Sequence, residues 1–266
     1  MENINNNYSE FYNITKKTKI TMWKRLRTYF VDFGFFIILY FALFYGAGVF
    51  GIEAMASDAI EGMNERIVYV CEQYDYPYKA GSNFGIYEID EEVFIDGLQE
   101  ADPTLTEAEG YDIYFEAQAT QLADLSSDAD YILNYSKFHT SYLFVDAICL
   151  LLPNLIFVCI IPIYDKENRT LGMKIFNQSL VNTKDERAAY KYKHIMRFVI
   201  LFIECFVTKV VFNYWAFLAL PLMELVIILS TPKKLSIFDA ISFTRVIDTD
   251  TADRTEEGTD IYTPSN

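Results

Sequence analysis

The chain has 266 residues, of which 52% are hydrophobic and 17% aromatic, yet its formal net charge is −15. Apolar residues and charges in these amounts must be separated along the chain, which argues against an ordinary soluble domain. Three of the four cysteines lie in apolar runs and the two histidines are far apart, so neither a disulfide framework nor a zinc site is expected.

The N-terminal region, residues 1–28, is polar and carries six Lys and Arg. The first long apolar run follows at Tyr29–Ile52 and holds a single charge, Asp32. A helix needs about 20 apolar residues to cross a membrane. We therefore expect residues 29–52 to form transmembrane helix 1.

Residues 53–140 hold 20 Asp and Glu against three Lys and Arg. Apolar residues follow a helical spacing over 53–74 and 104–135. Thr106 and Glu109 fit a capping box, which marks the start of a helix. Part of a small core is expected from Phe84, Tyr87, Phe94 and Ile95. We predict a compact, acidic, helical insertion here.

The second apolar run, residues 141–164, contains one charge, Asp146, and two prolines, Pro153 and Pro162. Prolines kink transmembrane helices, but they are tolerated there when neighbouring groups satisfy the freed carbonyls. We predict transmembrane helix 2 at 141–164 and a basic loop at 165–195.

The third apolar run, Phe198–Thr231, is too long for one pass, because a helix of that length reaches about 50 Å against roughly 30 Å for a bilayer core. A break is expected at Lys209–Trp215, where basic and aromatic residues suit a membrane interface. We predict a tight hairpin over 196–230, with helices at Met196–Val211 and Asn213–Ser230. A re-entrant or surface-lying first arm is the main alternative.

The distribution of Lys and Arg orients the chain, because cytoplasmic loops carry the excess. Eight lie within 165–197, against three within 53–140. Both termini and the basic loop are expected to be cytoplasmic, and the acidic insertion extracellular. A cytoplasmic closing segment, 231–248, requires an even number of passes, and the acidic tail, 249–266, is predicted to be disordered. The predicted fold is an all-α cell-membrane protein with four transmembrane helices.

Three segments beside the apolar runs resemble the RDD family of small bacterial membrane proteins. They are Arg25-Leu-Arg-Thr-Tyr-Phe-Val-Asp32, Arg169-Thr-Leu-Gly-Met-Lys174 and Lys233-Lys-Leu-Ser-Ile-Phe-Asp239-Ala-Ile-Ser-Phe-Thr244-Arg-Val. The residues that carry the likeness are Arg25, Asp32, Thr170, Leu171, Gly172, Lys174, Asp239 and Thr244. In the last segment Phe243 stands where the family has a glycine.

The resemblance covers roughly residues 20–52 and 141–248, and it leaves out the acidic insertion. The resemblance implies a membrane protein more than it implies a particular activity. Ion transport, including sodium/proton exchange, has been suggested for some members.

Arg25 and Asp32 are seven residues apart, which is two helical turns, so they share one helix face. An acid this close to the lipid headgroups needs a partner. We expect Asp32 to pair with a basic residue of another segment and to fix the helix bundle. An ion or proton site is the alternative.

Asp146, Glu204 and Glu224 lie inside the apolar runs. A carboxylate at mid-membrane depth costs about 2.5–3.5 kcal/mol on insertion scales, so such acids face the bundle or water. If the three converge, they form a candidate path for ions or protons. Otherwise each pairs with a cation or lies near an interface.

The sequence has no catalytic triad, P-loop or dinucleotide motif, so we expect no enzyme activity, catalytic residue, cofactor or metal site. The expected partners are the lipid bilayer, a protein outside the cell and further copies of the chain. Nucleic acid is not expected, because no reader fold accompanies the basic loop.

Two functions are consistent with these features. One is a membrane scaffold whose acidic ectodomain binds an outside partner. The other is a small ion- or proton-coupled transporter that uses the intramembrane carboxylates, as an oligomer, because four helices leave little room for a pathway. The 88-residue insertion favours the scaffold, since transport needs no such ectodomain.

Overall fold

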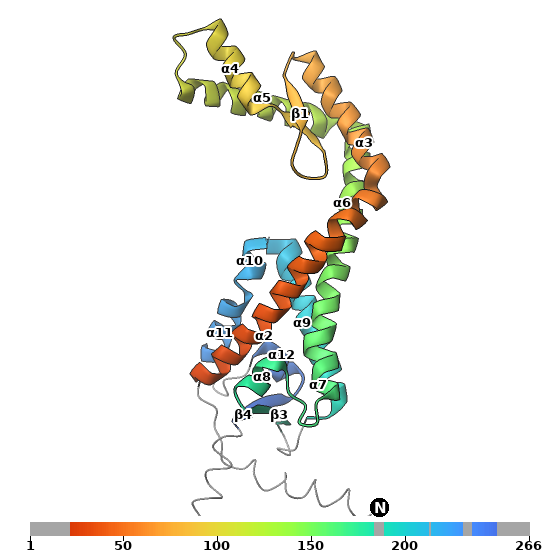
Figure 1. Cartoon of the computed structure of the whole chain (residues 1–266), viewed down its shortest axis with the longest axis vertical. Helices are drawn as coiled ribbons and strands as arrows, with labels where there is room; N and C mark the ends of the chain where they lie inside the picture. The colour runs from red at the N-terminus through yellow and green to blue at the C-terminus, as the bar shows by residue number, and fades with distance from the viewer. Residues whose placement is uncertain (1–21, 184–188, 213, 231–235, 249–266) are drawn as a thin grey trace, which may run out of the picture. The chain divides into compact units, whose positions relative to one another are not determined.

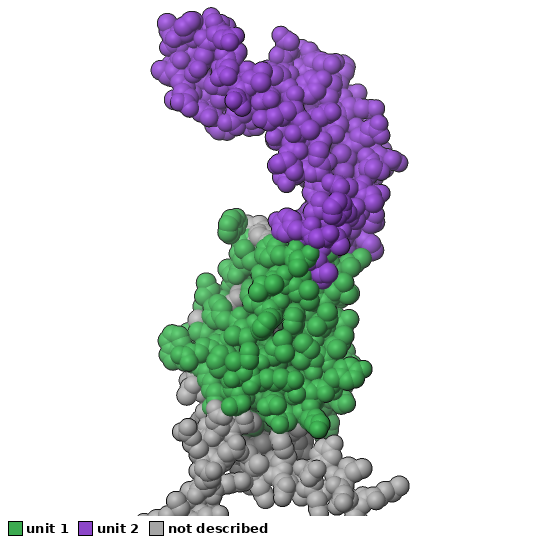
Figure 2. Space-filling view, viewed as in Figure 1, with its two compact units in different colours: residues 1–42, 148–266 green, residues 43–147 purple. Residues whose placement is uncertain are grey.

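The computed structural model describes residues 22–183, 189–212, 214–230 and 236–248, and helices make up 77% of it. The predicted tail, most of the N-terminal region and parts of the basic loop and the closing segment lie outside the described residues. The chain divides into two compact units (Figure 2). We call residues 43–147 the acidic unit, and residues 1–42 with 148–266 the hydrophobic unit.

The acidic unit is mostly helical. Its elements are η1 (Phe44–Gly48), α3 (Val49–Gln73), β1 (Tyr78–Ala80), β2 (Tyr87–Ile89), α4 (Glu91–Ala101), α5 (Glu107–Ser127) and most of α6 (Ala129–Asn154) (Figure 1). Helices α3, α4 and α5 and strand β2 supply one apolar core, formed by Ile67, Val70, Cys71, Ile89, Ile95, Tyr114, Ala117 and Leu125. Of the predicted core residues, Ile95 belongs to it, and Tyr87 and Phe94 pack against it.

Helix α5 begins at the predicted capping box. The Thr106 side chain accepts from the backbone N–H of Glu109, and the Glu109 side chain accepts from the backbone N–H of Thr106. The predicted helix over 104–135 is wrong in its continuity, because the chain breaks at Asp128. The Asp128 carboxylate accepts from the backbone N–H of Tyr131 at 2.8 Å and pairs with Arg66, so it caps the next helix, α6.

A short hairpin interrupts the helices of the acidic unit, so the prediction of a purely helical insertion was incomplete. Strands β1 and β2 pair antiparallel, with Tyr78 opposite Ile89. The side chain of Asn64 holds the hairpin against α3: it donates to the Gly85 carbonyl at 3.0 Å and accepts from the Tyr87 N–H at 2.8 Å.

The hydrophobic unit combines long helices with a small sheet. Its elements are α2 (Met22–Leu43), the end of α6, η2 (Leu155–Ile160), α7 (Ile161–Tyr164), α8 (Leu171–Ile175), β3 (Gln178–Asn182), α9 (Lys191–Val207), η3 (Thr208–Phe212), α10 (Tyr214–Leu218), α11 (Leu220–Ser230), α12 (Ile237–Ile241) and β4 (Thr244–Asp248).

Two helical runs, Trp23–Gln73 and Ala129–Tyr164, are long and apolar enough to cross a membrane. They contain the predicted helices at 29–52 and 141–164. Only 28% and 39% of the residues in their most apolar windows are buried, so most of these apolar residues are exposed or half-buried. The first run continues beyond Ile52 without interruption. In the second, Pro153 lies inside α6 and the π-helical segment η2 follows it.

The third apolar run is divided close to the predicted break. Helix α9 continues through η3 to Phe212, and α10 begins at Tyr214, where the chain turns back (Figure 1). Two boundaries differ from the prediction. Helix α9 begins at Lys191 rather than Met196, and the second arm is split into α10 and α11.

The predicted basic loop and the predicted closing segment contribute strands to a second small sheet. Strand β3, from the basic loop, pairs antiparallel with β4, from the closing segment, with Leu180 opposite Val246. Helices α8 and α12 lie beside these strands (Figure 1). The all-α prediction is therefore correct in its helical content and missed both strand pairs.

Candidate functional site

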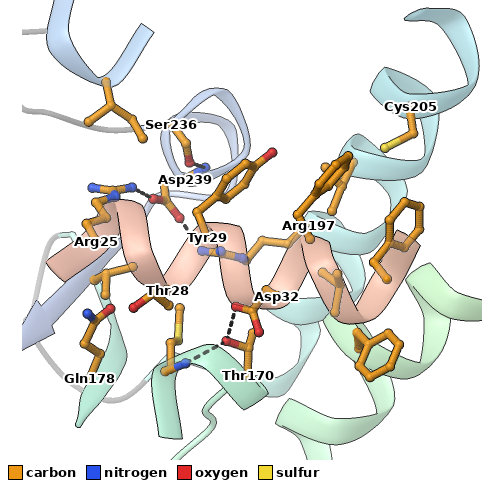
Figure 3. Close-up of a pocket in the computed structure, with 18 residues that line it drawn as sticks. Arg25, Thr28, Tyr29, Asp32, Thr170, Gln178, Arg197, Cys205, Ser236 and Asp239 are labelled. Carbon is orange, nitrogen blue, oxygen red and sulfur yellow. Dashed lines mark hydrogen bonds and ion pairs between the residues drawn. The ribbon is translucent and has the colours of Figure 1, made fainter. Parts of the chain in front are cut away.

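Three segments distant in sequence meet in the hydrophobic unit: the start of α2, the segment from α8 to β3, and the segment from α12 to β4. They are the segments that carry the RDD resemblance. Figure 3 shows Arg25, Asp32, Thr170 and Asp239 from these segments around one cavity, together with Arg197 of α9.

Asp239 lies at the centre of this cluster and is fully buried. Arg25 donates to one carboxylate oxygen of Asp239, and Arg197 donates to the other. Arg197 also donates to the hydroxyl of Thr244 at 3.2 Å, and the backbone N–H of Asp239 donates to the Ser236 hydroxyl at 3.2 Å. One carboxylate therefore joins α2, α9 and the closing segment.

The protonation of Asp239 follows from its surroundings. Burial raises the pKa of this carboxyl, but the charges of Arg197 and Arg25 more than offset that effect, and its pKa lies below the usual range for Asp. Asp239 is thus a carboxylate at neutral pH. Buried ion pairs of this kind are strongly destabilised when one partner is removed.

Asp32 is held by hydrogen bonds from the start of α8. Its carboxylate accepts from the Thr170 hydroxyl at 2.6 Å and from the backbone N–H of Gly172 at 2.7 Å. The Thr170 hydroxyl accepts from the backbone N–H of Met173 at 3.3 Å and caps α8. Among the described residues Asp32 forms no ion pair with the basic partner that was expected, because this hydroxyl and this N–H already occupy its carboxylate oxygens.

Gly172 is required by the close approach of α8 to α2. A Cβ atom at this position would lie 2.5 Å from the backbone oxygen of Thr28 and 3.0 Å from Cγ of Asp32. No other residue fits without moving a backbone. The glycine of this segment therefore has a packing reason.

The other motif residues of this segment serve it locally. Lys174 pairs with Asp165 at 2.9 Å, and Arg169 lies 3.4 Å from the same carboxylate. Burial by itself would raise the pKa of Asp165, but Lys174 and Arg169 lower it by a larger amount. The pKa therefore lies below the usual value for Asp, and the group is ionised. Leu171 is half-buried in the first turn of α8.

The closing segment is held by side-chain contacts, although it has Phe243 where the family that the chain resembles has glycine. Phe243 adopts a left-handed backbone conformation with φ of 54°, at the position where the family has glycine. Only glycine takes this conformation without steric cost. Lys193 donates to the Ser242 carbonyl at 2.6 Å, and Lys24 pairs with Asp248 at 2.6 Å, so both ends of β4 are anchored.

The cavity beside Asp239 has a volume of about 80 Å³. Its polar lining comes from Arg25, Asp32, Thr170, Gln178, Arg197 and Asp239, and its apolar lining from α2, η2, α9 and α11 (Figure 3). A cavity needs roughly 10–15 Å³ to hold one water molecule. The cavity is therefore large enough for several water molecules, although most of its surface is apolar and its polar groups gather around Asp239 and Asp32.

Two of the three predicted membrane acids come together. Glu204 of α9 and Glu224 of α11 have adjacent carboxyl groups, and Glu224 is fully buried. Among the described residues, neither Glu224 oxygen nor Oε2 of Glu204 has a hydrogen-bond partner. Asp146 is also buried, but it lies in α6 within the acidic unit. The pair of glutamates is the candidate ion or proton site.

Lys209 lies in the segment that was expected to suit a membrane interface. In the structure its ammonium group donates to the Tyr40 hydroxyl and lies over the rings of Tyr40 and Phe217, 4.7 and 5.9 Å from their centroids. Aromatic rings of α2 and α10 surround this cation within the hydrophobic unit.

No family model, no curated protein and no solved structure matches this chain. The RDD resemblance therefore stays a prediction that rests on the residues quoted above.

Arg197 is the principal site residue that sequence reasoning missed, because it was counted among the cations of the basic loop. One signal was available. His194, Arg197, Cys205 and Thr208 recur at helical spacing and are all buried, so the polar face of α9 points inward.

Proposed function

We propose that the chain is an integral membrane protein with four passes and both termini in the cytoplasm. Support comes from the surface of the hydrophobic unit. On α9 the exposed aliphatic side chains are Ile195, Val199, Ile203 and Val207, while His194, Arg197 and Cys205 are buried. On α11 the exposed apolar side chains among the described residues are Leu222, Met223, Val226 and Leu229. Such surfaces are costly in water and favourable in lipid.

Thiol labelling tests this topology. Ser82 lies exposed in the acidic unit, and Thr183 follows β3. A Ser82→Cys variant should react with a membrane-impermeant thiol reagent in intact cells, and Thr183→Cys should react only after the membrane is opened. Equal labelling of both sites in intact cells contradicts the orientation.

Within that membrane protein, we propose that Glu204 and Glu224 bind and exchange a proton or a small monovalent cation. The observation that carries this proposal is a pair of adjacent carboxyl groups inside the hydrophobic unit, Glu224 fully buried and Glu204 half-buried, with no Lys or Arg paired to either among the described residues. Two bare carboxylates at short distance in a low-dielectric interior repel each other strongly. A shared proton or a bound cation removes that repulsion.

The route to the pair is supported by the neighbouring cavity. Cys205, adjacent to Glu204, lines the cavity together with Arg197 and Asp239. Tyr29 also lines it and interacts electrostatically with both glutamates. Protons or cations that leave the pair would pass between these groups toward the β3–β4 sheet.

Flux into proteoliposomes tests the exchange. The purified protein should dissipate a pH gradient, measured with an internal pH dye, and Glu224→Gln should abolish that flux while the thermal midpoint in detergent stays within a few degrees. Glu224→Asp, which keeps the carboxyl group, should retain part of it. The exposed control Glu72→Gln should behave like the unmodified protein. Undiminished flux in Glu224→Gln overturns the proposal, and sodium and potassium gradients identify the ion.

A second function is favoured by the acidic unit, which has its own apolar core and most of the negative charge. This candidate is a scaffold whose acidic unit binds a partner outside the cell. Replacing residues 58–135 with a short Gly/Ser linker, which closes the gap at small entropic cost, should abolish the cellular phenotype. A linker variant with full function contradicts the scaffold.

A further inference from the structure

The acidic unit carries a groove between one face of α3 and the β1–β2 hairpin, with a volume of about 530 Å³. The α3 side contributes Glu53, Ser57, Ile60, Glu61, Asn64, Glu65 and Val68, and the hairpin contributes Phe84 and Tyr87. We propose that this groove binds an extended, cationic polypeptide segment of a partner protein. The inference rests on the scaffold candidate and names the chemistry of its partner.

The shape of the groove favours an elongated ligand. Its α3 wall extends from Glu53 to Val68, which corresponds to about 22 Å at 1.5 Å per helical residue. Six or seven residues of extended chain, at roughly 3.3 Å each, cover that length. The groove is open along its side, so a chain can enter laterally.

Three glutamates are spaced along the groove so that they match a ligand with cations at corresponding intervals. Glu61 and Glu65 are one helical turn apart, about 6 Å along α3, and Glu53 lies about 12 Å further back. Alternate side chains of an extended peptide lie about 6.6 Å apart on one face. Cations at positions 1, 5 and 7 of a heptapeptide therefore match these three carboxylates.

The apolar parts of the groove complete the fit. Ile60 and Val68 form a floor for the aliphatic stems of Arg or Lys, and the rings of Phe84 and Tyr87 offer faces for a guanidinium. The hairpin wall is already fixed by the two hydrogen bonds of Asn64, so binding requires little ordering of the protein. Arg66 of α3 and Lys79 of β1 pair with Asp128 and Asp90, so these cations are already neutralised.

Fluorescence anisotropy with a dye-labelled heptapeptide tests the groove. The peptide has arginine at positions 1, 5 and 7, leucine at position 3 and serine elsewhere, and the full-length protein is held in lipid nanodiscs at low salt. The Glu61→Gln/Glu65→Gln variant should bind about tenfold more weakly. The control Asp112→Asn/Glu116→Gln removes the same charge from an exposed turn of α5 and should change affinity less than twofold. Equal losses in both variants indicate attraction by net charge alone and overturn the groove.

Each variant of a second pair introduces one arginine and leaves the glutamates of the groove unchanged. Ser57→Arg should fill the groove with the protein's own guanidinium and weaken peptide binding, whereas Ser126→Arg, on the exposed end of α5, should not. A peptide with its three arginines adjacent should bind more weakly than the spaced peptide. Equal binding of both peptides, or of free spermine at the same affinity, overturns the proposed extended polypeptide.

The peptide-binding measurement and the replacement of residues 58–135 together distinguish failure of the groove from failure of the scaffold function. A folded protein that binds no cationic peptide overturns the groove, and a phenotype lost on replacing residues 58–135 keeps a partner-binding role for the acidic unit through another surface.

Discussion

The two units of this chain distribute charge in opposite ways. In the hydrophobic unit, Arg25, Arg197 and Asp239 are buried, while aliphatic side chains of α9 and α11 are exposed. In the acidic unit, the core is apolar and most carboxylates are exposed. This is the distribution expected if lipid surrounds the hydrophobic unit and water surrounds most of the acidic unit, whose residues 43–52 and 141–147 belong to the predicted transmembrane helices.

The comparison shows what holds each unit together. The acidic unit depends on removing apolar side chains from water, an effect proportional to buried area. In lipid the hydrophobic unit would gain little from that effect, so a membrane location would make its specific hydrogen bonds, ion pairs and close backbone contacts the main stabilising terms. Substitutions should therefore act through different mechanisms in the two units.

Asp239→Asn should have the largest effect. It leaves two buried guanidinium groups without their shared carboxylate, and removing one partner of a buried ion pair costs about 3–5 kcal/mol. Thermal unfolding in detergent and the yield of folded protein measure the loss. The control Asp96→Asn, on an exposed face of α4, should change stability by less than about 0.5 kcal/mol. Equal stability of the two variants would remove the buried ion pairs from the account of this unit.

The same residue predicts a dependence on pH. Because the pKa of Asp239 is lowered in the folded protein, its ion pairs contribute stability above the unfolded value of about 3.9 and lose it as the pH falls through the folded pKa. Acid titration should show a stability loss below about pH 4 that Asp239→Asn lacks. A variant with an unchanged acid limb would show that other carboxylates control it.

Ile67→Ala tests the apolar core of the other unit. Ile67 is 3% exposed, and truncating a buried Ile costs about 2–5 kcal/mol through lost burial and the remaining cavity. Hydrogen exchange should accelerate in α3, α4 and α5 and stay unchanged around Asp239. Val93→Ala, at an exposed position of α4, is the control. Accelerated exchange in both units would show that they unfold together.

Gly172→Ala should cost about 1–3 kcal/mol, because the added methyl group would lie 2.5 Å from the backbone oxygen of Thr28. Gly97→Ala is the matched control in α4, where an added Cβ meets nothing within 4 Å. There the better helix propensity of alanine should stabilise the acidic unit by up to about 1 kcal/mol. Thermal midpoints measure both, and shifts of the same sign would contradict the close approach of α8 to α2.

Phe243→Gly should have the smallest effect and the opposite sign. It relieves a left-handed conformation that costs a residue with a side chain about 1–2 kcal/mol, offset by glycine's greater unfolded-state entropy and the lost ring contact with Lys193. A gain below about 1 kcal/mol is expected, measured by thermal unfolding. Phe243→Ala loses the ring but keeps the conformational cost, so it should be less stable than Phe243→Gly.

Features that depend on neighbouring residues were readable without a structure. The long apolar runs follow from composition, and the capping box at Thr106 and Glu109 involves residues three apart. The break in the third apolar run follows from its length, which exceeds one bilayer thickness, whereas the convergence of Glu204 and Glu224 was left open. In each case the relevant physics acts over one helical turn or one bilayer thickness.

Features that join distant residues could not be read in the same way. The β3–β4 sheet pairs residues 178–182 with residues 244–248, and five-residue strands carry too weak a pattern to predict a partner. The partner of Asp32 was assigned by charge, but the start of α8 satisfies it with a hydroxyl and a backbone N–H. Arg197 was counted among the cations of the basic loop, but it lies within α9 and its side chain pairs with Asp239. Such contacts arise when segments distant in sequence pack or pair in the tertiary structure, which a local pattern of residue types does not specify.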